Sequence, residues 1–278
     1  MSKRFSRLVV IAALVSAATA PVVATPASGA SDVGIQATTF DDEFNGPAGS
    51  AVDGSKWNIE TGNNNGNNNE RQFYTNRASN VSMDGQGHLV ITARKENPSN
   101  FQCWYGRCTY TSARLNTSGK FSQTFGHVEA RLKMPTGQGM WPAFWMLGTN
   151  INSVGWPTCG EVDIMENIGR EPNTNHGTIH GPGYSGANGV GAAFNGPRFS
   201  DGFHTFRLDW SQNSLAWSVD GKVYERRTPA DVNGHQWVFN HPFFIILNLA
   251  VGGSFPGDPN SGTPFPNTLV VDYVRVTT

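Results

Sequence analysis

Charged residues are scarce in this sequence, and positive charge is not in excess. Asp, Glu, Lys and Arg make up 15% of its 278 residues, against about a quarter in a typical domain, and the formal net charge is −1. Proteins that bind nucleic acid present a dense array of Lys and Arg to the phosphates, and the sequence has no such basic cluster. A nucleic-acid partner and a heavily sulfated polymer are therefore not expected.

Cysteine is also scarce, with three residues in the chain. Cys103 and Cys108 flank Trp-Tyr-Gly-Arg, a span short enough for a turn. In an oxidising compartment this pair is expected to form a local disulfide. No second pair of Cys or His has the spacing of zinc ligands, so a zinc site is not expected. Cys159 would then be free and buried, where it acts as a small apolar residue.

The first thirty residues have the layout of a secretory signal peptide. Three basic residues precede position 8, an uncharged stretch follows from Leu8 to Ala20, and small residues end at Ala30. A membrane anchor is the alternative, but this apolar stretch is shorter than the roughly 20 residues that span a bilayer. We therefore predict that residues 1–30 direct secretion to the extracellular space and that no other segment enters a membrane. The remaining chain has 17 basic and 21 acidic side chains, a net charge of −4.

Helical patterning is missing from the sequence. No stretch of twelve or more residues combines a 3.6-residue period with freedom from Gly and Pro. Asp220-Gly221 is a strong hairpin turn, and Phe243–Val251 is almost entirely apolar, which is typical of a buried central strand. Apolar and polar residues alternate with the period of a β-strand in the segments 89–94, 128–134, 206–210, 215–219 and 270–276.

Many short strands separated by turns are typical of a β-sandwich or a β-barrel. The sequence has no internal repeat and no Ser/Thr/Pro-rich linker. We therefore expect residues 31–278 to form a single all-β domain.

Three carboxylates lie within six positions of an otherwise apolar strand. Residues 160–168 read Gly-Glu-Val-Asp-Ile-Met-Glu-Asn-Ile, and burying such charges is costly unless pairing or function compensates. Glu161 and Asp163 share a strand face, whereas Glu166 has the opposite parity. One extra residue around Ile164–Met165, a β-bulge, would return Glu166 to the same face, and bulges often redirect side chains next to active sites.

Three neighbouring carboxylates cannot all ionise cheaply. Repulsion raises the pKa of at least one, which leaves a protonated acid beside an anion. An acid and a carboxylate on either side of a bond are the equipment for glycoside hydrolysis. A metal cluster is the alternative use of three carboxylates. The sequence has no Gly-x-Ser-x-Gly or His-Glu-x-x-His motif, so a serine or metal-dependent hydrolase of those types is not expected.

Further motifs accompany the carboxylates in a fixed order along the chain. They are Asp42-Glu43-Phe44-Asn45-Gly46, Asn69-Glu70-Arg71-Gln72-Phe73-Tyr74, Trp141-Pro-Ala-Phe-Trp145-Met-Leu, His176-Gly-Thr-Ile-His180, Asn248-Leu-Ala-Val-Gly-Gly253 and Asp272-Tyr-Val-Arg-Val. Together with Glu161-Val-Asp163-Ile-Met-Glu166, this set resembles glycoside hydrolase family 16, and most of all its bacterial endo-1,3-β-glucanases, the laminarinases. The resemblance covers roughly residues 38–278.

The resemblance implies an all-β fold, a β-jelly-roll sandwich of two curved antiparallel sheets with a sugar cleft on the concave face. It also implies retaining hydrolysis by double displacement through a glycosyl-enzyme. By position in the motif, Glu161 would be the nucleophile and Glu166 the general acid/base. Asp163 would hydrogen-bond the nucleophile and help to move the proton. No catalytic cofactor is implied.

The predicted bulge bears on the substrate. The bulged form resembles laminarinases, agarases and carrageenases, whereas the unbulged form resembles lichenases and xyloglucan-active enzymes. Carrageenan is sulfated and the chain is acidic, so β-1,3-glucan is the leading substrate, and mixed-linkage β-1,3-1,4-glucan is expected to be accepted too. Agarose or lichenan remains an alternative substrate. A glucan-binding lectin of the same fold is a further alternative, although a lectin would be expected to have lost Glu161 or Glu166.

Several residues are expected to contact the sugar. Trp141 and Trp145 are four residues apart and share a strand face, so their rings could stack on pyranose rings. Both could instead be core tryptophans. His180 is also expected to contact the sugar, and its alternative is a structural role. The Asn-rich segment 62–69 is either a solvated loop or a loop that lines the sugar site. The predicted substrate-binding residues are Trp141, Trp145, Trp156, His180, Asn69, Glu70 and Arg71, and Arg114 is a weaker candidate.

Asp272 interrupts the apolar register of Val270, Val274 and Val276. An acid in a buried register needs a partner, and a hard cation is one option besides a hydrogen bond. The family resemblance implies a structural Ca²⁺ on the convex side, with Glu43, the Gly87 carbonyl and Asp272 as ligands. We expect the protein to act as a monomer.

Overall fold

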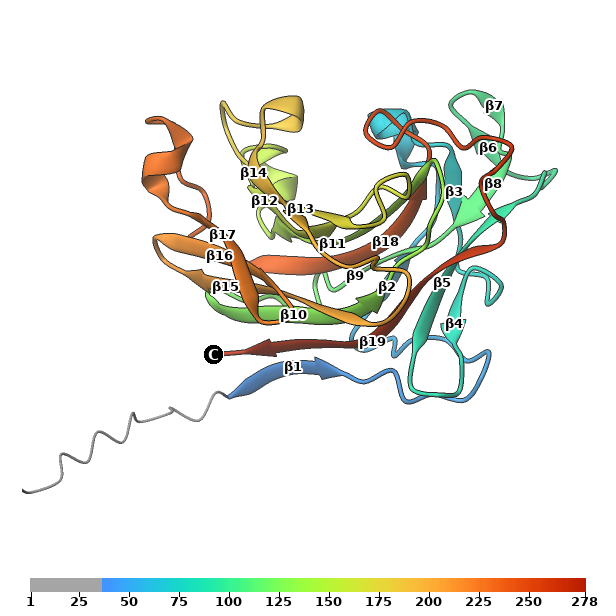
Figure 1. Cartoon of the computed structure of the whole chain (residues 1–278), viewed down its shortest axis with the longest axis horizontal. Coiled ribbons are helices and arrows are strands. Elements are labelled where there is room, and N and C mark those ends of the chain that lie inside the picture. The colour runs from blue at the N-terminus through green and yellow to red at the C-terminus, as the bar shows by residue number, and fades with distance from the viewer. Residues whose placement is uncertain (1–36) are drawn as a thin grey trace, which may run out of the picture. The chain divides into compact units, whose positions relative to one another are not determined.

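Two β-sheets are stacked face to face in the part of the chain that the structure describes, residues 37–278 (Figure 1). The structure is a computed structural model, and these residues fall within one compact unit. The signal peptide predicted for residues 1–30 lies outside the described residues.

Within residues 37–278 the larger sheet has ten strands. Eight follow one another in the spatial order β17 (Lys222–Arg227), β16 (Ser214–Val219), β15 (His204–Ser211), β10 (Gly126–Lys133), β19 (Asn267–Thr277), β5 (Leu89–Lys95), β8 (Tyr110–Ser112) and β3 (Gln72–Tyr74). The other two are β1 (Thr38–Asp42), which pairs with β19, and β4 (Val81–Met83), which pairs with β5. The pairs are antiparallel except for β3 and β8, which run parallel.

The smaller sheet has seven strands in the described part of the chain. Their spatial order is β14 (Val190–Asn195), β13 (Thr174–His180), β12 (Glu161–Glu166), β11 (Met140–Gly148), β18 (Phe243–Val251), β9 (Arg114–Asn116) and β2 (Asn58–Glu60). Every neighbouring pair is antiparallel. Because β12 has hydrogen-bonded neighbours on both sides, its backbone holds the three carboxylates in fixed positions.

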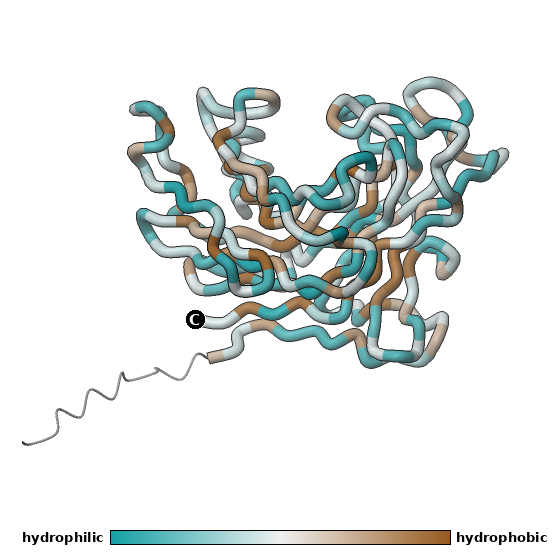
Figure 2. The backbone as a smooth tube through the Cα atoms, viewed as in Figure 1, coloured by the Kyte–Doolittle hydropathy of each residue, from teal (hydrophilic) through white to brown (hydrophobic). Residues whose placement is uncertain are grey.

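The apolar core lies between the two sheets, and hydrophobic segments run through both layers (Figure 2). In β10 the alternate residues Val128, Ala130 and Leu132 are fully buried, as their period of two predicts. All nine residues of Phe243–Val251 are buried, which confirms the predicted central strand. On the face of this strand that points away from the main core, Phe244 and Ile246 are buried in a small second apolar cluster.

The hairpin turn predicted at Asp220-Gly221 joins β16 to β17. Both residues have positive φ angles, 49° for Asp220 and 77° for Gly221. This left-handed pair matches the twist of the flanking strands in a two-residue hairpin, and Gly adopts it without steric cost.

The predicted register of the last strand is right for Val274 and Val276 and wrong for Val270. The buried residues of β19 are Leu269, Val271, Val274 and Val276. The pairing of β19 with β10 shifts by one residue at Asp272, which has no partner of its own in that register. The alternation therefore changes phase at Asp272, whose side chain turns out of the core and is 26% exposed. Val270 is likewise not a core residue.

Helices are short in the described residues. They are α1 (Ile151–Val154) and the 3₁₀ segments η1 (Asn64–Asn69), η2 (Gly186–Asn188) and η3 (Pro229–Val232). None is long and apolar enough to cross a membrane. A small hairpin, β6 (Gln102–Cys103) and β7 (Gly106–Arg107), forms a separate two-stranded sheet. The predicted Cys103–Cys108 disulfide is confirmed, and Cys159 is free and buried as expected.

Candidate active site

A β-bulge in β12 decides where its carboxylates point. On β13, Thr178 lies opposite Asp163 and His176 lies opposite Glu166. Three steps along β12 therefore match two steps along β13, and the pairing of β12 with β11 shifts at the same place. The bulge predicted around Ile164–Met165 is confirmed.

The bulge sends the polar and apolar side chains of β12 to opposite sides of the sheet. Val162, Ile164 and Met165 are buried in the core between the sheets. Glu161, Asp163 and Glu166 all line one cleft of about 950 Å³ on the other face of the smaller sheet. A regular strand would have directed one of these carboxylates into the core.

Cross-strand rows form the floor of this cleft. One row contains Ala193, His176, Glu166, Ala143, Asn248 and Arg114, each opposite the next on neighbouring strands. The adjacent row contains Gly191, Thr178, Asp163, Trp145 and Ile246. Toward β14 the rows end in the small residues Ala193 and Gly191, which leave room. Toward β18 they include Trp145, Asn248 and Arg114.

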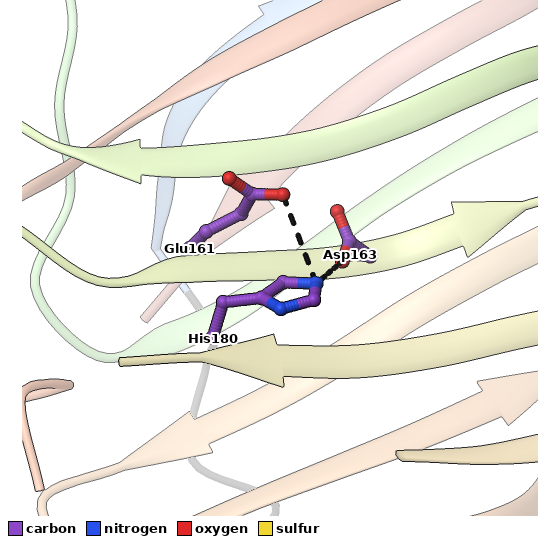
Figure 3. A group of neighbouring side chains, drawn as sticks. All are labelled: Glu161, Asp163 and His180. Carbon is purple, nitrogen blue, oxygen red and sulfur yellow. Dashed lines mark hydrogen bonds and ion pairs between the residues drawn. The ribbon is translucent and has the colours of Figure 1, made fainter. Parts of the chain in front are cut away.

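His180 and Trp156 are the hydrogen-bonding neighbours of Asp163 and Glu161. His180 Nε2 lies 3.0 Å from Asp163 Oδ2 and 3.9 Å from Glu161 Oε1 (Figure 3). The indole Nε1 of Trp156 donates a hydrogen bond of 2.7 Å to Glu161 Oε2. At the other end of β12, the indole Nε1 of Trp141 donates one of 2.8 Å to Glu166 Oε1.

Burial makes all three carboxyls weak acids, and charge repulsion adds to this effect at the two glutamates. Burial, followed by the charge of Asp163, raises the pKa of Glu161 and of Glu166 to about 8 each. Burial raises the pKa of Asp163 to about 7. The sequence predicted a raised pKa from repulsion, and burial is the larger cause. The hydrogen bonds from Trp156 and Trp141 act in the opposite direction, because they stabilise the ionised forms.

The two predicted platform tryptophans share the cleft face of β11. Trp141 and Trp145 line the cleft, whereas Phe144 and Met146 between and beside them are buried in the core. The Trp145 indole donates a 2.7 Å hydrogen bond to Asn248 Oδ1, and the Arg114 guanidinium lies 4.9 Å from the centre of its ring. Both rings are therefore held in place on the cleft floor.

Residues 68–275 match the sequence model of glycosyl hydrolases family 16. The chain belongs to this family. The β-glucanase of Rhodothermus marinus is 39% identical over 237 residues, which is 81% of this chain and 79% of that protein. The glucan endo-1,3-beta-glucosidase A1 of Niallia circulans is 38% identical over 257 residues, which is 85% of this chain but 37% of that longer protein.

A solved family 16 structure has the same fold. The laminarinase catalytic domain from Thermotoga maritima MSB8 superimposes with a TM-score of 0.81 at 44% identity, covering 87% of this chain and 98% of that domain. The predicted β-jelly-roll sandwich is therefore confirmed. Family 16 hydrolases need no catalytic cofactor.

The cleft collects most, but not all, of the residues predicted to contact sugar. Those that line it are Trp141, Trp145, Trp156, His180 and Glu70, together with the weaker candidate Arg114. Asn69 and Arg71 are not among its lining residues within the described chain. The Asn69 amide donates to Ser254 Oγ at 2.9 Å, and the Arg71 guanidinium forms a two-point ion pair with Asp258, so both side chains are used to hold loops together.

Sequence reasoning missed several lining residues. His176 precedes His180 by four positions in the same motif, so strand periodicity alone would have placed both on one face. Asn248 is the single polar residue in the apolar run of β18, and a buried amide in such a run signals a site. Phe255 had no such signal, because it reaches the cleft from an irregular loop and packs edge-on against Trp141 at 5.7 Å.

Two groups of residues are candidates for holding a cation. Glu161, Asp163 and His180 have ligand atoms within 4.8 Å of one another, which keeps the metal-cluster interpretation of the carboxylates testable. The residues implied for structural Ca²⁺ have other neighbours in the structure. Asn45 Oδ1 adjoins Gly87, and His88 Nε2 lies 3.9 Å from Asp272 Oδ1.

Both carboxylates of the implied calcium site already have a cationic neighbour. Arg275 donates to Glu43 Oε1 at 2.7 Å, and Arg131 pairs with Asp272 Oδ2. A carboxylate accepts about four hydrogen bonds, so its remaining oxygen is available to a hard cation. A Ca²⁺ ion would have to share both carboxylates with these arginines, and the calcium site stays a prediction.

Proposed function

We propose that this family 16 chain is an endo-acting, retaining hydrolase of β-1,3-glucosidic bonds in β-glucans such as laminarin and curdlan. The observation that carries the proposal is the bulged strand that turns Glu161, Asp163 and Glu166 into one tryptophan-lined cleft. The names of its relatives, a β-glucanase, a glucan endo-1,3-beta-glucosidase and a laminarinase, support β-1,3-glucan as the substrate. Mixed-linkage β-1,3-1,4-glucan is proposed as a second substrate.

Glu161 is proposed as the nucleophile that attacks the anomeric carbon. Its oxygen must be ionised to attack, and the Trp156 hydrogen bond favours that form. The bond from the anomeric carbon to the leaving oxygen breaks as the bond to Glu161 forms, which gives a covalent glycosyl-enzyme. Asp163 lies between the two glutamates along β12 and contacts His180. Its side chain also hydrogen-bonds with Glu161, so the two carboxyls can share a proton.

Glu166 is proposed as the general acid and then the general base. Burial raises the pKa of both glutamates, and their repulsion disfavours the state in which both are ionised. With Glu161 ionised, Glu166 holds the proton, which goes to the leaving oxygen in the first step. In the second step the resulting carboxylate takes a proton from water, whose oxygen attacks the anomeric carbon and releases Glu161. Two displacements at the same carbon retain its configuration.

The cleft favours internal cleavage of a long chain. It extends from the Asn-rich η1 loop on one side to the segment around η2 on the other, and it has more room than one sugar ring needs. Small residues of β14, among them Gly191 and Ala193, leave the floor open beside the carboxylates. The protein is further proposed to be secreted, because the first thirty residues have the layout of a signal peptide. It is also proposed to act as a monomer.

A structural Ca²⁺ is proposed at Glu43, the Gly87 carbonyl and Asp272. When bound, the ion would link the 43–45 segment, the loop before β5 and β19 on the convex side. It takes no part in the chemistry, because these residues are not among the residues that line the cleft.

A digestion panel tests the proposed function. Laminarin, curdlan, lichenan, carboxymethyl-cellulose and agarose are incubated with the secreted protein, and the products are sized over time with and without EDTA. Early release of mixed oligosaccharides from laminarin, with cellulose untouched, is expected. Cleavage of agarose or lichenan alone would move the substrate, and glucan binding without cleavage would favour the lectin. Loss of activity in EDTA that Ca²⁺ restores without a change in melting temperature would favour a metal at Glu161, Asp163 and His180.

A further inference from the structure

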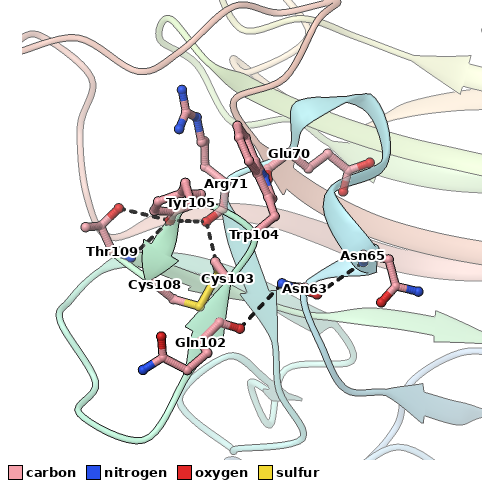
Figure 4. The surroundings of a disulfide bond; sticks show 10 residues. All are labelled: Asn63, Asn65, Glu70, Arg71, Gln102, Cys103, Trp104, Tyr105, Cys108 and Thr109. Atoms are coloured by element: carbon pink, nitrogen blue, oxygen red, sulfur yellow. Dashed lines mark hydrogen bonds between the residues drawn. A yellow bond between two sulfur atoms is a disulfide. The ribbon is translucent and has the colours of Figure 1, made fainter.

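A disulfide-closed hairpin stands behind the Asn-rich loop that lines the cleft (Figure 4). Its strands β6 and β7 are joined through Trp104 and Tyr105, and Cys108 closes it onto Cys103. Neither aromatic residue lines the cleft. Trp104 is nevertheless 45% exposed, so burial of its own ring does not explain why a large aromatic side chain stands at this tip.

The two aromatic side chains bind consecutive backbone carbonyls. The Trp104 indole donates to the Glu70 carbonyl at 2.7 Å, and the Tyr105 hydroxyl donates to the Arg71 carbonyl at 2.6 Å. The Tyr105 hydroxyl also accepts a 3.1 Å hydrogen bond from the Thr109 amide, which fixes its own position. Glu70 and Arg71 are the link between the Asn-rich loop and β3.

These hydrogen bonds tie the hairpin to the backbone of the link between the Asn-rich loop and β3. On their amide side, Arg71 N–H donates to the Val251 carbonyl at 2.8 Å and Glu70 N–H donates to the Asn67 carbonyl at 3.1 Å. On their carbonyl side, the side chains of Trp104 and Tyr105 donate to Glu70 and Arg71, next to the point where β3 begins its parallel pairing with β8. Backbone groups of ordered segments need partners, so the hairpin contributes to the hydrogen bonding of this link.

The Asn-rich loop needs such support from outside. Four of its asparagines, Asn64, Asn65, Asn68 and Asn69, have φ angles between 50° and 58°. Non-glycine residues in the left-handed region persist when the surroundings determine their conformation. The loop presents Asn64, Asn67 and Asn68 to the cleft, so its conformation sets where these amides meet a ligand.

The hairpin also packs against the loop and against the next residue of the link. A Cβ atom on Gly66 would lie 2.9 Å from Trp104 Cγ, so the loop backbone rests on the indole. The Arg71 guanidinium lies 5.0 Å from the ring centres of both Trp104 and Tyr105. Asp258 holds that guanidinium from the other side. The loop therefore lies on a rigid support built by the hairpin.

We propose that Trp104 and Tyr105 are positioning residues that set the affinity of the cleft for glucan at the end lined by Asn64, Asn67 and Glu70. They act through the Glu70 and Arg71 carbonyls and not by touching substrate. The Cys103–Cys108 disulfide holds the two aromatic residues at the hairpin tip. This inference rests on the proposed glucan hydrolysis, because it concerns the affinity of that same cleft for glucan.

The test removes one hydrogen bond at a time and keeps an aromatic ring at each position. Trp104→Phe removes the indole donor, and Tyr105→Phe removes the hydroxyl donor. Trp237→Phe and Tyr184→Phe are matched controls, since these side chains also donate to backbone carbonyls, of Gln212 and Gln236, but do not line the cleft. Losing one net hydrogen bond corresponds to a rise in KM for laminarin of about 3- to 10-fold, with kcat changed by less than about twofold.

Three outcomes would overturn the proposal. One is an unchanged KM in both hairpin variants, another is the same rise in KM in the controls, and the third is a fall in kcat with KM unchanged. If one hairpin variant does not fold, the other still decides. Amide hydrogen exchange of residues 63–71 gives an independent reading, and about threefold faster exchange is expected in the hairpin variants alone. A wild-type protein that cleaves no glucan would end the proposed function, whereas unchanged exchange in this segment would end the positioning role.

Discussion

The indole Nε1 of Trp156 lies 2.7 Å from Oε2 of Glu161, so an exposed aromatic residue stabilises the charge of a partly buried carboxylate. Trp141 makes the equivalent contact with Glu166. Each glutamate of the pair thus has one indole donor, and the tryptophans that are proposed to stack on sugar also influence the acidity of the site.

Replacing Trp156 by Phe should move the acidic limb of the pH profile of kcat/KM to higher pH. The Trp156 hydrogen bond lowers the pKa of Glu161, whereas burial and the charge of Asp163 raise it. Loss of the hydrogen bond should therefore raise the pKa of Glu161 further. The profile is measured on laminarin across the pH range. Trp145→Phe is the control, because that indole donates to the neutral Asn248 amide. An acidic limb that stays in place in Trp156→Phe, or moves equally in the control, would contradict the assignment.

Glu161→Gln should abolish hydrolysis while glucan binding remains. The amide cannot form the glycosyl-enzyme, and a fall in kcat of about 10⁴-fold or more is expected for loss of a nucleophile. Turnover is followed by reducing ends, and binding by co-sedimentation with insoluble curdlan. Glu225→Gln is a matched control, since Glu225 is a buried carboxyl that does not line the cleft. Normal turnover by Glu161→Gln would end the nucleophile role.

Glu166→Gln should slow substrates in proportion to how poor their leaving group is. General acid catalysis contributes about 10²- to 10⁴-fold, and a good leaving group does not need it. Glucan hydrolysis should therefore fall by that factor, while an activated aryl β-glucoside oligomer should be affected far less in its first step. Equal losses on both substrates would show that Glu166 does not protonate the leaving oxygen.

Asp163→Asn should stabilise the fold at alkaline pH. Burial raises the pKa of Asp163 from 3.8 to about 7, so the folded chain keeps a proton that the unfolded chain releases. Its contribution to the free energy of unfolding is therefore lost as pH rises from about 4 to about 7. At pH 8 the variant should melt higher than the wild type, by about 2–4 °C for each kcal/mol of unfolding free energy regained. At pH 4 the two proteins should melt at the same temperature. A difference in melting temperature that is the same at both pH values would contradict this origin.

Removing Ca²⁺ should lower the melting temperature and leave the active-site chemistry intact. The ion would link Glu43, Gly87 and Asp272, which lie outside the cleft lining. The melt is recorded in EDTA, then after Ca²⁺ is added back, with elemental analysis of the untreated protein. Asp272→Asn should melt at the same temperature with and without EDTA. An unchanged melt of the wild type, with no metal found, would remove the calcium site.

Much of the fold could be predicted from the sequence, because strands impose a period of two on their neighbours in the chain. The alternation at Val128, Ala130 and Leu132 and the apolar run Phe243–Val251 identified their strands correctly. The prediction failed at Asp272, because a bulge changes the phase of the alternation and no local signal marks it. At Ile164–Met165 the same kind of defect could be predicted, because the carboxylates on either side required it.

The sequence by itself determined the all-β class, the local disulfide and the carboxylate motif, since each depends on residues a few positions apart. Tertiary structure alone decided which of the predicted sugar contacts reach the cleft. Arg71 has a plausible motif position, yet it pairs with Asp258, 187 residues away, and so holds loops together outside the cleft. Phe255 has no motif of its own, yet it packs against Trp141. Such contacts depend on how the sheets and loops pack in space, and spacing along the chain does not encode them.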